Sequence, residues 1–303
     1  MIIDGLIDKI KLFKNPSAAG LDTDFSYLPD NMKARIKSLS GAAEAVFEFN
    51  ANIIDHIYDI VPCVKVQVAY YEALGVSGME CFAKTLKYAK SKGMFTIADC
   101  KRNDISSTAK CYSDAYLGET VINGKNFKPF ECDFLTVNAY LGSDGIKPFL
   151  ENCKKFDKGV FVLVKTSNQS GAELQNKKIE NGGLVYEQMA EYVNGWGVGL
   201  TGKYGYSSVG AVVGATHKTE AENIRKKYPK MFFLIPGYGA QGGKAEDIAV
   251  CFEKNLAGGI VNSSRGLLLA YKNENYKGTT YFKAARAAAS DMQNELYQVI
   301  GNR

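Results

Sequence analysis

Short apolar runs alternate with helix-like segments along most of the chain. Residues 1–10 have helical spacing. Helical segments are also expected at 41–60, 77–91, 105–117, 184–194, 219–227, 245–255 and 281–299. Between them lie short runs of β-branched, apolar or small residues, which predict buried strands at 17–22, 61–68, 94–99, 132–137, 159–164, 209–213, 231–235 and 259–261.

Eight strands, each followed by a helix or by room for one, predict a TIM (β/α)8 barrel of the α/β class. The alternative is a doubly wound sheet, which would more often show a G-x-G-x-x-G turn after its first strand. The chain reads Gly20-Leu21-Asp22 there instead. We therefore expect one barrel domain over 1–303, with N-terminal and C-terminal helical extensions, and a mobile loop over the active site at 171–183.

Composition supports a folded protein that binds a small anionic molecule. Of the 303 residues, 46% are hydrophobic and 23% are charged, which allows a sizeable core. The net charge is +5, and Lys and Arg are scattered instead of forming a basic stripe with interleaved aromatic residues. No nucleic-acid partner is expected, and the slight positive charge fits an anionic substrate.

The cysteines and histidines argue against a metal centre or a disulfide framework. The seven cysteines are odd in number, widely spaced and form no C-x-x-C pair, which is typical of reduced cysteines in a cytosolic protein. His56 and His217 are too few and too far apart for a metal cluster. The N-terminal segment lacks the features of a signal peptide, and no apolar run reaches ~20 residues, so we expect a cytoplasmic protein without a membrane span.

Charged residues gather at the ends of the first three predicted strands. Asp22 ends the first strand, Lys65 lies within the second, and Asp99 and Lys101 end the third, where alternation puts both on one side. The simpler interpretation is a strand emerging into solvated charges, with Asp104 capping the next helix. In a barrel, however, these strand ends hold the catalytic residues, and one alternating carboxylate–ammonium network explains all four positions.

The last two predicted strands are followed by residues suited to a phosphate group. The glycine-rich segment from Pro236 to Gly243 follows the seventh strand, and Asn262-Ser263-Ser264-Arg265-Gly266 follows the eighth. Backbone N–H groups and the forked cation of Arg265 bind phosphate well. Barrel enzymes commonly hold a phosphate in these two loops, so the order of the motifs predicts a phosphate site.

These motifs together resemble the orotidine 5′-monophosphate decarboxylase family. The resemblance rests on Asp99-x-Lys101-x-x-Asp104-Ile105-x-x-Thr108, on Asp22, Lys65 and Arg265 in family order, and on Pro236-Gly-x-Gly-Ala-Gln241-Gly. The segment 161–168 is similar to the longer, divergent branch of the family found in many bacteria and some apicomplexan parasites. The resemblance covers about residues 17–271. Two positions depart from it: Asn103 stands where many members have Gly or Ala, and Ser264 where some have Gly.

The resemblance implies loss of CO₂ from C6 of orotidine 5′-monophosphate, giving UMP in pyrimidine biosynthesis, with no cofactor and no metal. Lys101 is then expected to deliver the proton to C6. Asp99 is expected to face the substrate carboxylate, and Lys65 to complete the charge network.

The resemblance also implies roles for the remaining site residues. Asp22 and Lys65 are expected to bind the ribose hydroxyls, and Thr166 and Ser167 to contact the edge of the pyrimidine. The phosphate is expected to be held by Tyr238 and Gln241, in the loop that begins at Pro236, and by Arg265 after the eighth strand. The other subunit of a homodimer is expected to receive Asp104, Ile105 and Thr108 into its active site.

Two other functions are compatible with the same residues. One is a sugar-phosphate enzyme of the same suprafamily, a 3-keto-6-phosphogulonate decarboxylase or a hexulose-phosphate synthase, which uses Mg²⁺ and an enediolate. The segment Thr166-Ser167-Asn168 argues against it. The other is a barrel that binds a phosphate ligand without catalysis.

Overall fold

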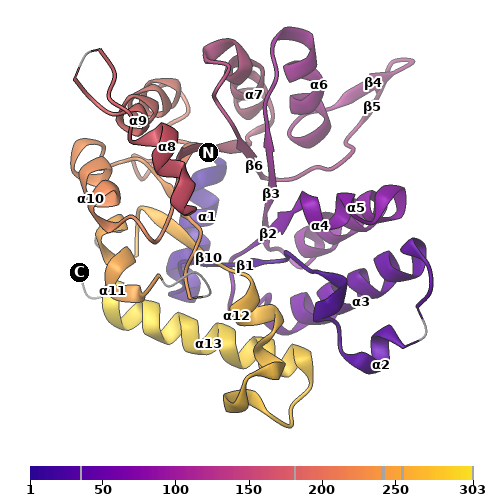
Figure 1. Cartoon of the computed structure of the whole chain (residues 1–303). Helices are drawn as coiled ribbons and strands as arrows, with labels where there is room; N and C mark the ends of the chain where they lie inside the picture. Colours follow the sequence, from indigo (N-terminus) through magenta and orange to yellow (C-terminus); the bar gives the residue numbers. More distant parts are fainter. Residues whose placement is uncertain (35, 181, 240–242, 254–255, 302–303) are drawn as a thin grey trace.

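The computed structural model describes residues 1–34, 36–180, 182–239, 243–253 and 256–301. Within these ranges, eight parallel strands close into a barrel in the order β1-β10-β9-β8-β7-β6-β3-β2 (Figure 1). They are β1 (Ser17–Gly20), β2 (Cys63–Gln67), β3 (Phe95–Arg102), β6 (Phe134–Val137), β7 (Gly159–Lys165), β8 (Val209–Val213), β9 (Phe233–Ile235) and β10 (Gly259–Ser263). The TIM-barrel prediction is confirmed.

The helices pack mostly outside the barrel (Figure 1). They are α1 (Ile2–Phe13), α2 (Asp30–Lys33), α3 (Leu39–Ile57), α4 (Val68–Glu72), α5 (Gly75–Ser91), α6 (Ser106–Tyr116), α7 (Ser143–Phe156), α8 (Ala172–Gln175), α9 (Val185–Trp196), α10 (Lys218–Lys227), α11 (Ala245–Ile248), α12 (Arg265–Leu268) and α13 (Tyr281–Ile300). The helix predicted over 245–255 is wrong in its second half. α11 ends at Ile248, one 3₁₀ turn follows over Ala249–Cys251, and Phe252 is extended.

Aromatic side chains fill the end of the barrel where the strands begin. The rings of Phe95 and Phe134 lie 6.5 Å apart, those of Phe134 and Phe161 5.3 Å, and those of Phe161 and Phe232 6.3 Å. Phe134, Phe161 and Phe232 are buried, and burying one such ring contributes about 2–3 kcal/mol. This end is therefore a packed core, and the chemistry is left to the opposite end.

Helix α1 lies against that aromatic layer. Gly5 faces Phe95, and a Cβ added at Gly5 would lie 3.0 Å from the ring, so glycine lets the helix approach closely. The Asp4 carboxylate accepts the backbone N–H of Lys203 at 3.1 Å, which ties the helix to the segment before β8. The N-terminal helix is thus part of the barrel's packing.

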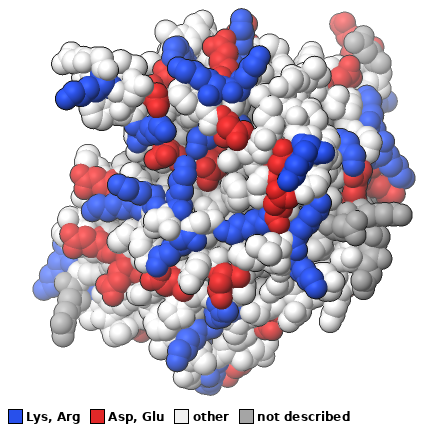
Figure 2. Space-filling model, turned by 180° about the vertical axis from the view of Figure 1, so that it is seen from behind, with Lys and Arg blue, Asp and Glu red and all other residues white. Residues whose placement is uncertain are grey.

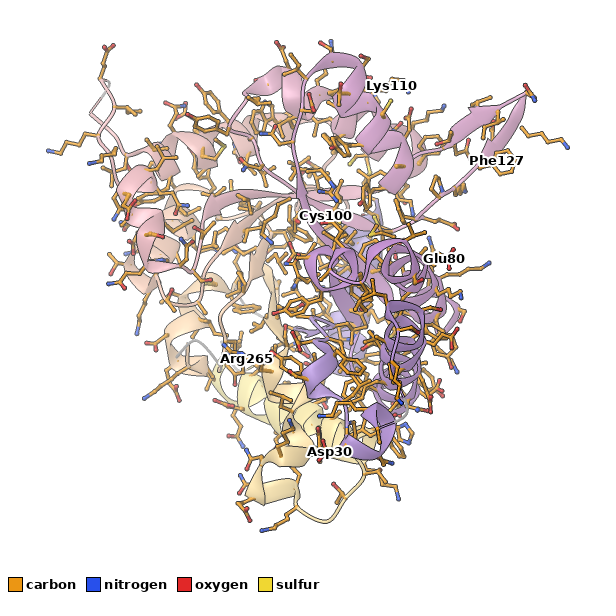
Figure 3. All side chains as sticks on the ribbon, turned by 45° about the vertical axis from the view of Figure 1, so that its right-hand side comes forward. Asp30, Glu80, Cys100, Lys110, Phe127 and Arg265 are labelled. Atoms are coloured by element: carbon orange, nitrogen blue, oxygen red, sulfur yellow. The ribbon has the colours of Figure 1, made fainter. Side chains whose placement is uncertain are left out.

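A hairpin that was not predicted lies between α6 and β6. Strands β4 (Thr120–Ile122) and β5 (Lys125–Phe127) are antiparallel, and Asn123 and Gly124 between them both have positive φ, as a type I′ turn requires. The hairpin extends from the body of the molecule, with Phe127 labelled on it in Figure 3. All residues of its two strands are exposed.

Strand register brings the predicted charged residues together. Gly20 of β1 is the register partner of Lys65 in β2, and Gln67 of β2 is the partner of Asp99 in β3. Parallel strands run in the same direction, so their C-terminal ends lie at the same end of the barrel. Asp22, two residues after Gly20, therefore lies beside Lys65 and Asp99. All three lie at the C-terminal end of the barrel.

Charges of both signs are mixed on one face of the molecule. Figure 2 shows Lys and Arg interspersed with Asp and Glu on the face turned away from the viewer in Figure 1. That face carries no single-sign stripe among its described residues, in line with the scattered basic residues of the sequence. No helix in the described ranges has the length and apolarity needed to cross a membrane.

Candidate active site

A cavity of about 530 Å³ opens at the C-terminal ends of the strands. Most of the residues singled out in the sequence line it: Asp22, Lys65, Asp99, Lys101, Thr166, Ser167, Pro236, Tyr238 and Arg265. Asp104, Ile105 and Thr108 are not among the described residues that line it. Gln241 lies outside the described residues. The barrel therefore brings together side chains that lie within, or shortly after, β1, β2, β3, β7, β9 and β10.

Four charged side chains form a continuous chain across β1, β2 and β3. Lys65 Nζ lies 3.1 Å from Asp22 Oδ1 and 2.8 Å from Asp99 Oδ2. Lys101 Nζ lies 2.7 Å from Asp99 Oδ1. The signs alternate from Asp22 to Lys101, so every buried charge has an opposite charge beside it.

The alternation fixes the charge states at the centre of the chain. Burial by itself would lower the pKa of Lys65, but the charges of Asp22 and Asp99 outweigh it and hold that pKa above its ordinary value. Burial would likewise raise the pKa of Asp99, but Lys65 and Lys101 hold it far below the ordinary range. At neutral pH, Lys65 is a cation and Asp99 an anion.

Asp99 receives four donors. Besides the two lysines, Gln67 Nε2 donates to Oδ2 and Thr136 Oγ1 donates to Oδ1, each at 2.8 Å. Thr136 Oγ1 also accepts the backbone N–H of Lys101 at 3.0 Å. One threonine of β6 therefore holds both the carboxylate and the backbone that carries the neighbouring ammonium.

Lys101 reaches the cavity by a different route from the one predicted. Strand β3 continues to Arg102, and its register with β6 shifts between Ala98 and Arg102. Lys101 has φ of +48°, which breaks the simple alternation that was expected to align it with Asp99. The two side chains do meet, but through an irregular strand end, and 44% of the Lys101 side chain stays exposed.

The end of β7 is held from both sides. Gln175 Oε1 accepts the Thr166 backbone N–H at 3.1 Å, and Gln175 Nε2 donates to Thr166 Oγ1 at 2.7 Å. On the other side, Thr216 Oγ1 donates to the carbonyl of Ser167 at 3.2 Å. The segment expected to be a mobile loop thus contains α8 and contacts the cavity wall; its mobility stays a prediction.

The expected phosphate side is only partly described. Pro236, Tyr238 and Arg265 lie on it. The Tyr238 hydroxyl donates to Glu295 Oε2 of α13 at 2.5 Å, and burial together with that carboxylate raises the pKa of Tyr238. A phenol has one proton to donate, so in this arrangement the hydroxyl of Tyr238 has none left for a phosphate.

The three residues expected to serve the other subunit lie beyond the cavity. Ile105 is 51% exposed, and Thr108 is exposed on α6. Asp104 Oδ1 accepts the backbone N–H of Ile105 at 2.8 Å. The predicted cap is misplaced by one residue, because Ile105 is the N-cap of α6 and no side chain bonds the first turn.

Four polar lining residues were missed in the sequence, Tyr27, Gln67, Tyr70 and Thr136, whereas Asn262 and Ser264 were noted only as part of the segment after the eighth strand. Gln67 carries a usable signal, because it stands two positions after Lys65 and so faces the same side of the strand. Thr136 is a lone polar residue in an apolar strand, which more often marks packing than a site. Their contributions follow from strand register, which a single sequence does not reveal.

No group of three or more His, Cys, Asp or Glu side chains within the described ranges is arranged to hold a metal ion. The donors around the cavity are instead lysines, amides and hydroxyls next to two carboxylates. This set suits an organic anion with hydroxyl groups, because it offers cations and hydrogen-bond donors together with acceptors for hydroxyl protons.

Comparison with known proteins identifies what the chain is similar to. Residues 44–277 match the model of the orotidine 5′-phosphate decarboxylase / HUMPS family. An orotidine 5′-phosphate decarboxylase of Clostridium acetobutylicum is 42% identical over 300 residues, covering 99% of this chain and 100% of the relative. One from Caldicellulosiruptor saccharolyticus is 44% identical over 302 residues, covering 98% of each chain.

The fold has a matching solved structure. The OMP decarboxylase of Leishmania donovani superposes with a TM-score of 0.75 and 26% identity, covering 99% of this chain and 98% of the other. The similarity therefore includes both the barrel and the segments at its two ends.

Proposed function

Because this chain belongs to the orotidine 5′-phosphate decarboxylase / HUMPS family, we propose how its charge chain carries out the family reaction. The protein decarboxylates orotidine 5′-monophosphate to UMP and CO₂ in pyrimidine biosynthesis, the reaction for which its full-length relatives are named. The observation that carries the mechanism is the position of Lys101 Nζ, 2.7 Å from the buried Asp99 carboxylate and open to the cavity.

In the proposed mechanism, the substrate carboxylate lies beside Asp99 and is repelled by it. The bond from C6 to the carboxyl carbon breaks, CO₂ leaves, and the electron pair stays on C6. The Lys101 ammonium stabilises this charge and then gives a proton to C6. Lys65 supports the step by holding Asp99 ionised and in place.

The remaining groups position the nucleotide. We assign the ribose hydroxyls to Asp22 and Lys65 and the pyrimidine edge to Thr166 and Ser167, since each pair lines one part of the cavity. The phosphate is assigned to Arg265. We also assign the phosphate to Gln241, which lies outside the described residues. Pro236 and Tyr238 line this side of the cavity, and Tyr238 serves as wall because its hydroxyl is bound to Glu295.

We further propose that the enzyme is a homodimer whose sites are shared. Asp104, Ile105 and Thr108 lie outside the cavity of their own chain and at its surface, so they are available to a second copy. We also propose that residues 1–303 form one barrel domain with helical extensions. A cytoplasmic location is proposed as well, supported by seven free cysteines.

The two other functions have less support. A sugar-phosphate enzyme that uses Mg²⁺ is disfavoured by full-length relatives named as orotidine 5′-phosphate decarboxylases. A non-catalytic barrel would have little use for a lysine held at a buried carboxylate. Turnover of orotidine 5′-monophosphate in EDTA separates all three.

The test is the fall in absorbance when orotidine 5′-monophosphate is added to the purified protein in EDTA. Lys101→Ala should lower kcat by about a thousandfold or more, since it removes both the proton donor and the countercharge. Its affinity for UMP should change little. The control is Lys226→Ala on α10, whose ion pair with Glu222 is exposed and whose residues do not line the cavity. Normal turnover by Lys101→Ala would disprove the assigned role.

A further inference from the structure

A second hydrogen-bonded chain reaches Asp22 from the end of β10, the strand that pairs with β1 on the side away from β2. Lys65 uses Oδ1 of this carboxylate, and the Ser264 hydroxyl donates to Oδ2 at 2.8 Å. Asn262 Nδ2 in turn donates to Ser264 Oγ at 3.1 Å. The two oxygens of Asp22 are therefore held by different strands, β2 on one side and the end of β10 on the other.

The direction of every hydrogen in this relay is determined. A carboxylate only accepts, so the single hydroxyl proton of Ser264 goes to Asp22. The Ser264 oxygen can then only accept, which turns the NH₂ of Asn262 towards it. Asn262 Oδ1 is left buried with no partner among the described residues, on a side chain that lines the cavity.

Close packing shows that the relay is built into the fold. A Cβ added at Gly20 would lie 1.9 Å from Ser264 Oγ and 2.9 Å from Asn262 Oδ1. Both polar side chains thus occupy space that only a glycine of β1 leaves open. Asn262 is 6% exposed, so the hydrogen bond from its side-chain amide to Ser264 is formed away from bulk water.

We propose that Ser264, oriented by Asn262, is a positioning residue that sets the Asp22 carboxylate to receive a ribose hydroxyl. The proposal rests on the assignment of Asp22 to the ribose in the proposed function. Lys65 and Ser264 each donate to one oxygen of Asp22 and so hold the carboxylate in one orientation. The lone pairs that they leave free then point in fixed directions. A ribose hydroxyl then binds a carboxylate that is already aligned, which lowers the cost of ordering it on binding.

The test compares the binding of UMP, 2′-deoxy-UMP and 3′-deoxy-UMP by calorimetry. The wild type should prefer UMP to the analogue that lacks the hydroxyl bound by Asp22 by about tenfold or more. Ser264→Ala should weaken UMP about tenfold and that analogue less than about twofold, so the preference collapses. Because Lys101 is untouched, KM for orotidine 5′-monophosphate should rise while kcat is largely kept.

Two more variants separate positioning from a loss of folding. Gly20→Ala keeps Ser264 but pushes its hydroxyl away, and Asn262→Ala removes only its orienting partner. Both should lose part of the same preference. Thermal unfolding of each variant checks that the barrel is intact, and Ser91→Ala, an exposed hydroxyl on α5, is the matched control.

The variant Asp22→Asn tests the ribose assignment separately from the proposed role of Ser264. If Asp22→Asn loses the preference for UMP while Ser264→Ala keeps it, the ribose assignment stands and the role of Ser264 is wrong. If Asp22→Asn keeps the preference, the ribose assignment itself fails, and the role of Ser264 fails with it. Loss of the preference in both variants supports the proposal.

Discussion

Asp99 is a buried carboxylate that four donors hold in its ionised form. An isolated buried anion costs several kcal/mol, which two neighbouring cations and two neutral donors offset here. All four donors lie on β2, β3 or β6. Asp99 is thus kept charged by fixed groups before the substrate arrives, as electrostatic preorganisation requires.

Asp99→Asn should lower the free energy of unfolding by about 3 kcal/mol at pH 7, because it leaves Lys65 and Lys101 short of a countercharge. The pKa of Asp99 in the folded state lies below its unfolded value of about 3.9. Its stabilising effect is therefore present above that pH and lost as the pH falls towards the folded pKa. Urea titrations from pH 7 to pH 2.5 should show the difference between variant and wild type shrinking below pH 4.

The control for this prediction is Glu151→Gln, an exposed acid on α7, which should change stability by less than about 0.5 kcal/mol. A wild-type advantage over Asp99→Asn that stays constant down to pH 2.5 would contradict the assigned charge of Asp99.

The charged site residues at the strand ends could be predicted from the sequence. The residues that hold them by hydrogen bonds could not. Lys65 and Asp99 stand out because a charge within or after an apolar run must be paired or exposed. Thr136 and Ser264 acquire their contacts from neighbouring strands that are 37 and 242 residues distant in sequence. Hydroxyl residues are common at loops and strand ends, so only the register of the barrel singles out these two.

The segment after β7 contains short helices and is hydrogen-bonded to the end of the strand. The 3₁₀ turn Gln169–Gly171 and helix α8 follow each other, and Gln175 at the end of α8 returns to Thr166. The side chain of Lys165, fully buried, donates to Asn176 at 2.6 Å. Lys165 at the end of β7 and Thr166 just after it thus hold two adjacent residues of the segment, Asn176 and Gln175.

Gln175→Ala should raise the dissociation constant of UMP about tenfold, because Thr166 loses two hydrogen bonds that fix the wall beside the pyrimidine. Hydrogen exchange at the Thr166 amide should accelerate in the same variant, since that N–H loses its acceptor. Glu173→Gln, exposed on α8, is the control. Unchanged exchange at Thr166 in Gln175→Ala would contradict this arrangement.

The periodicity of the sequence located the barrel strands, but it missed one hairpin and overextended one helix between them. The hairpin β4–β5 was missed although Asn123-Gly124 between Val121-Ile122 and Lys125 is a strong turn signal. The helix predicted over 245–255 was too long because Val250, Cys251 and Phe252 continue the apolar run of the sequence, although α11 ends at Ile248 and the backbone is extended at Phe252. Both errors lie outside the strands that form the cavity.

The whole molecule is a barrel with one packed end and one reactive end. Helix α1 and the aromatic layer occupy the first, and the charge chain with the Ser264 relay occupies the second. The cavity draws on strands from both halves of the chain. Asp104 and its neighbours lie beside this end but outside the cavity, which is why a second copy enters the proposal.

Mixing Lys101→Ala with Asp104→Ala tests whether sites are shared between subunits. Each variant alone should be nearly inactive. Random reassociation of equal amounts gives half hybrid dimers, and each hybrid has one site with an intact Lys101 and an intact Asp104 from the other chain. The mixture should recover about a quarter of the wild-type activity. A mixture no more active than its parents, with dimers formed, would show that each site lies within one chain.

The pairing of β1 with β10 has a consequence for how the protein is made. Lys101 and Arg265 are about 160 residues apart, and at 5–20 residues per second the ribosome needs roughly 10–30 s to pass from one to the other. Throughout that interval β1 has an unpaired edge, and Asp22 lacks its partner from Ser264. A nascent chain therefore gains catalytic capacity only after β10 and Arg265 have been made, and in the meantime its open sheet edge is the part that a chaperone would have to protect.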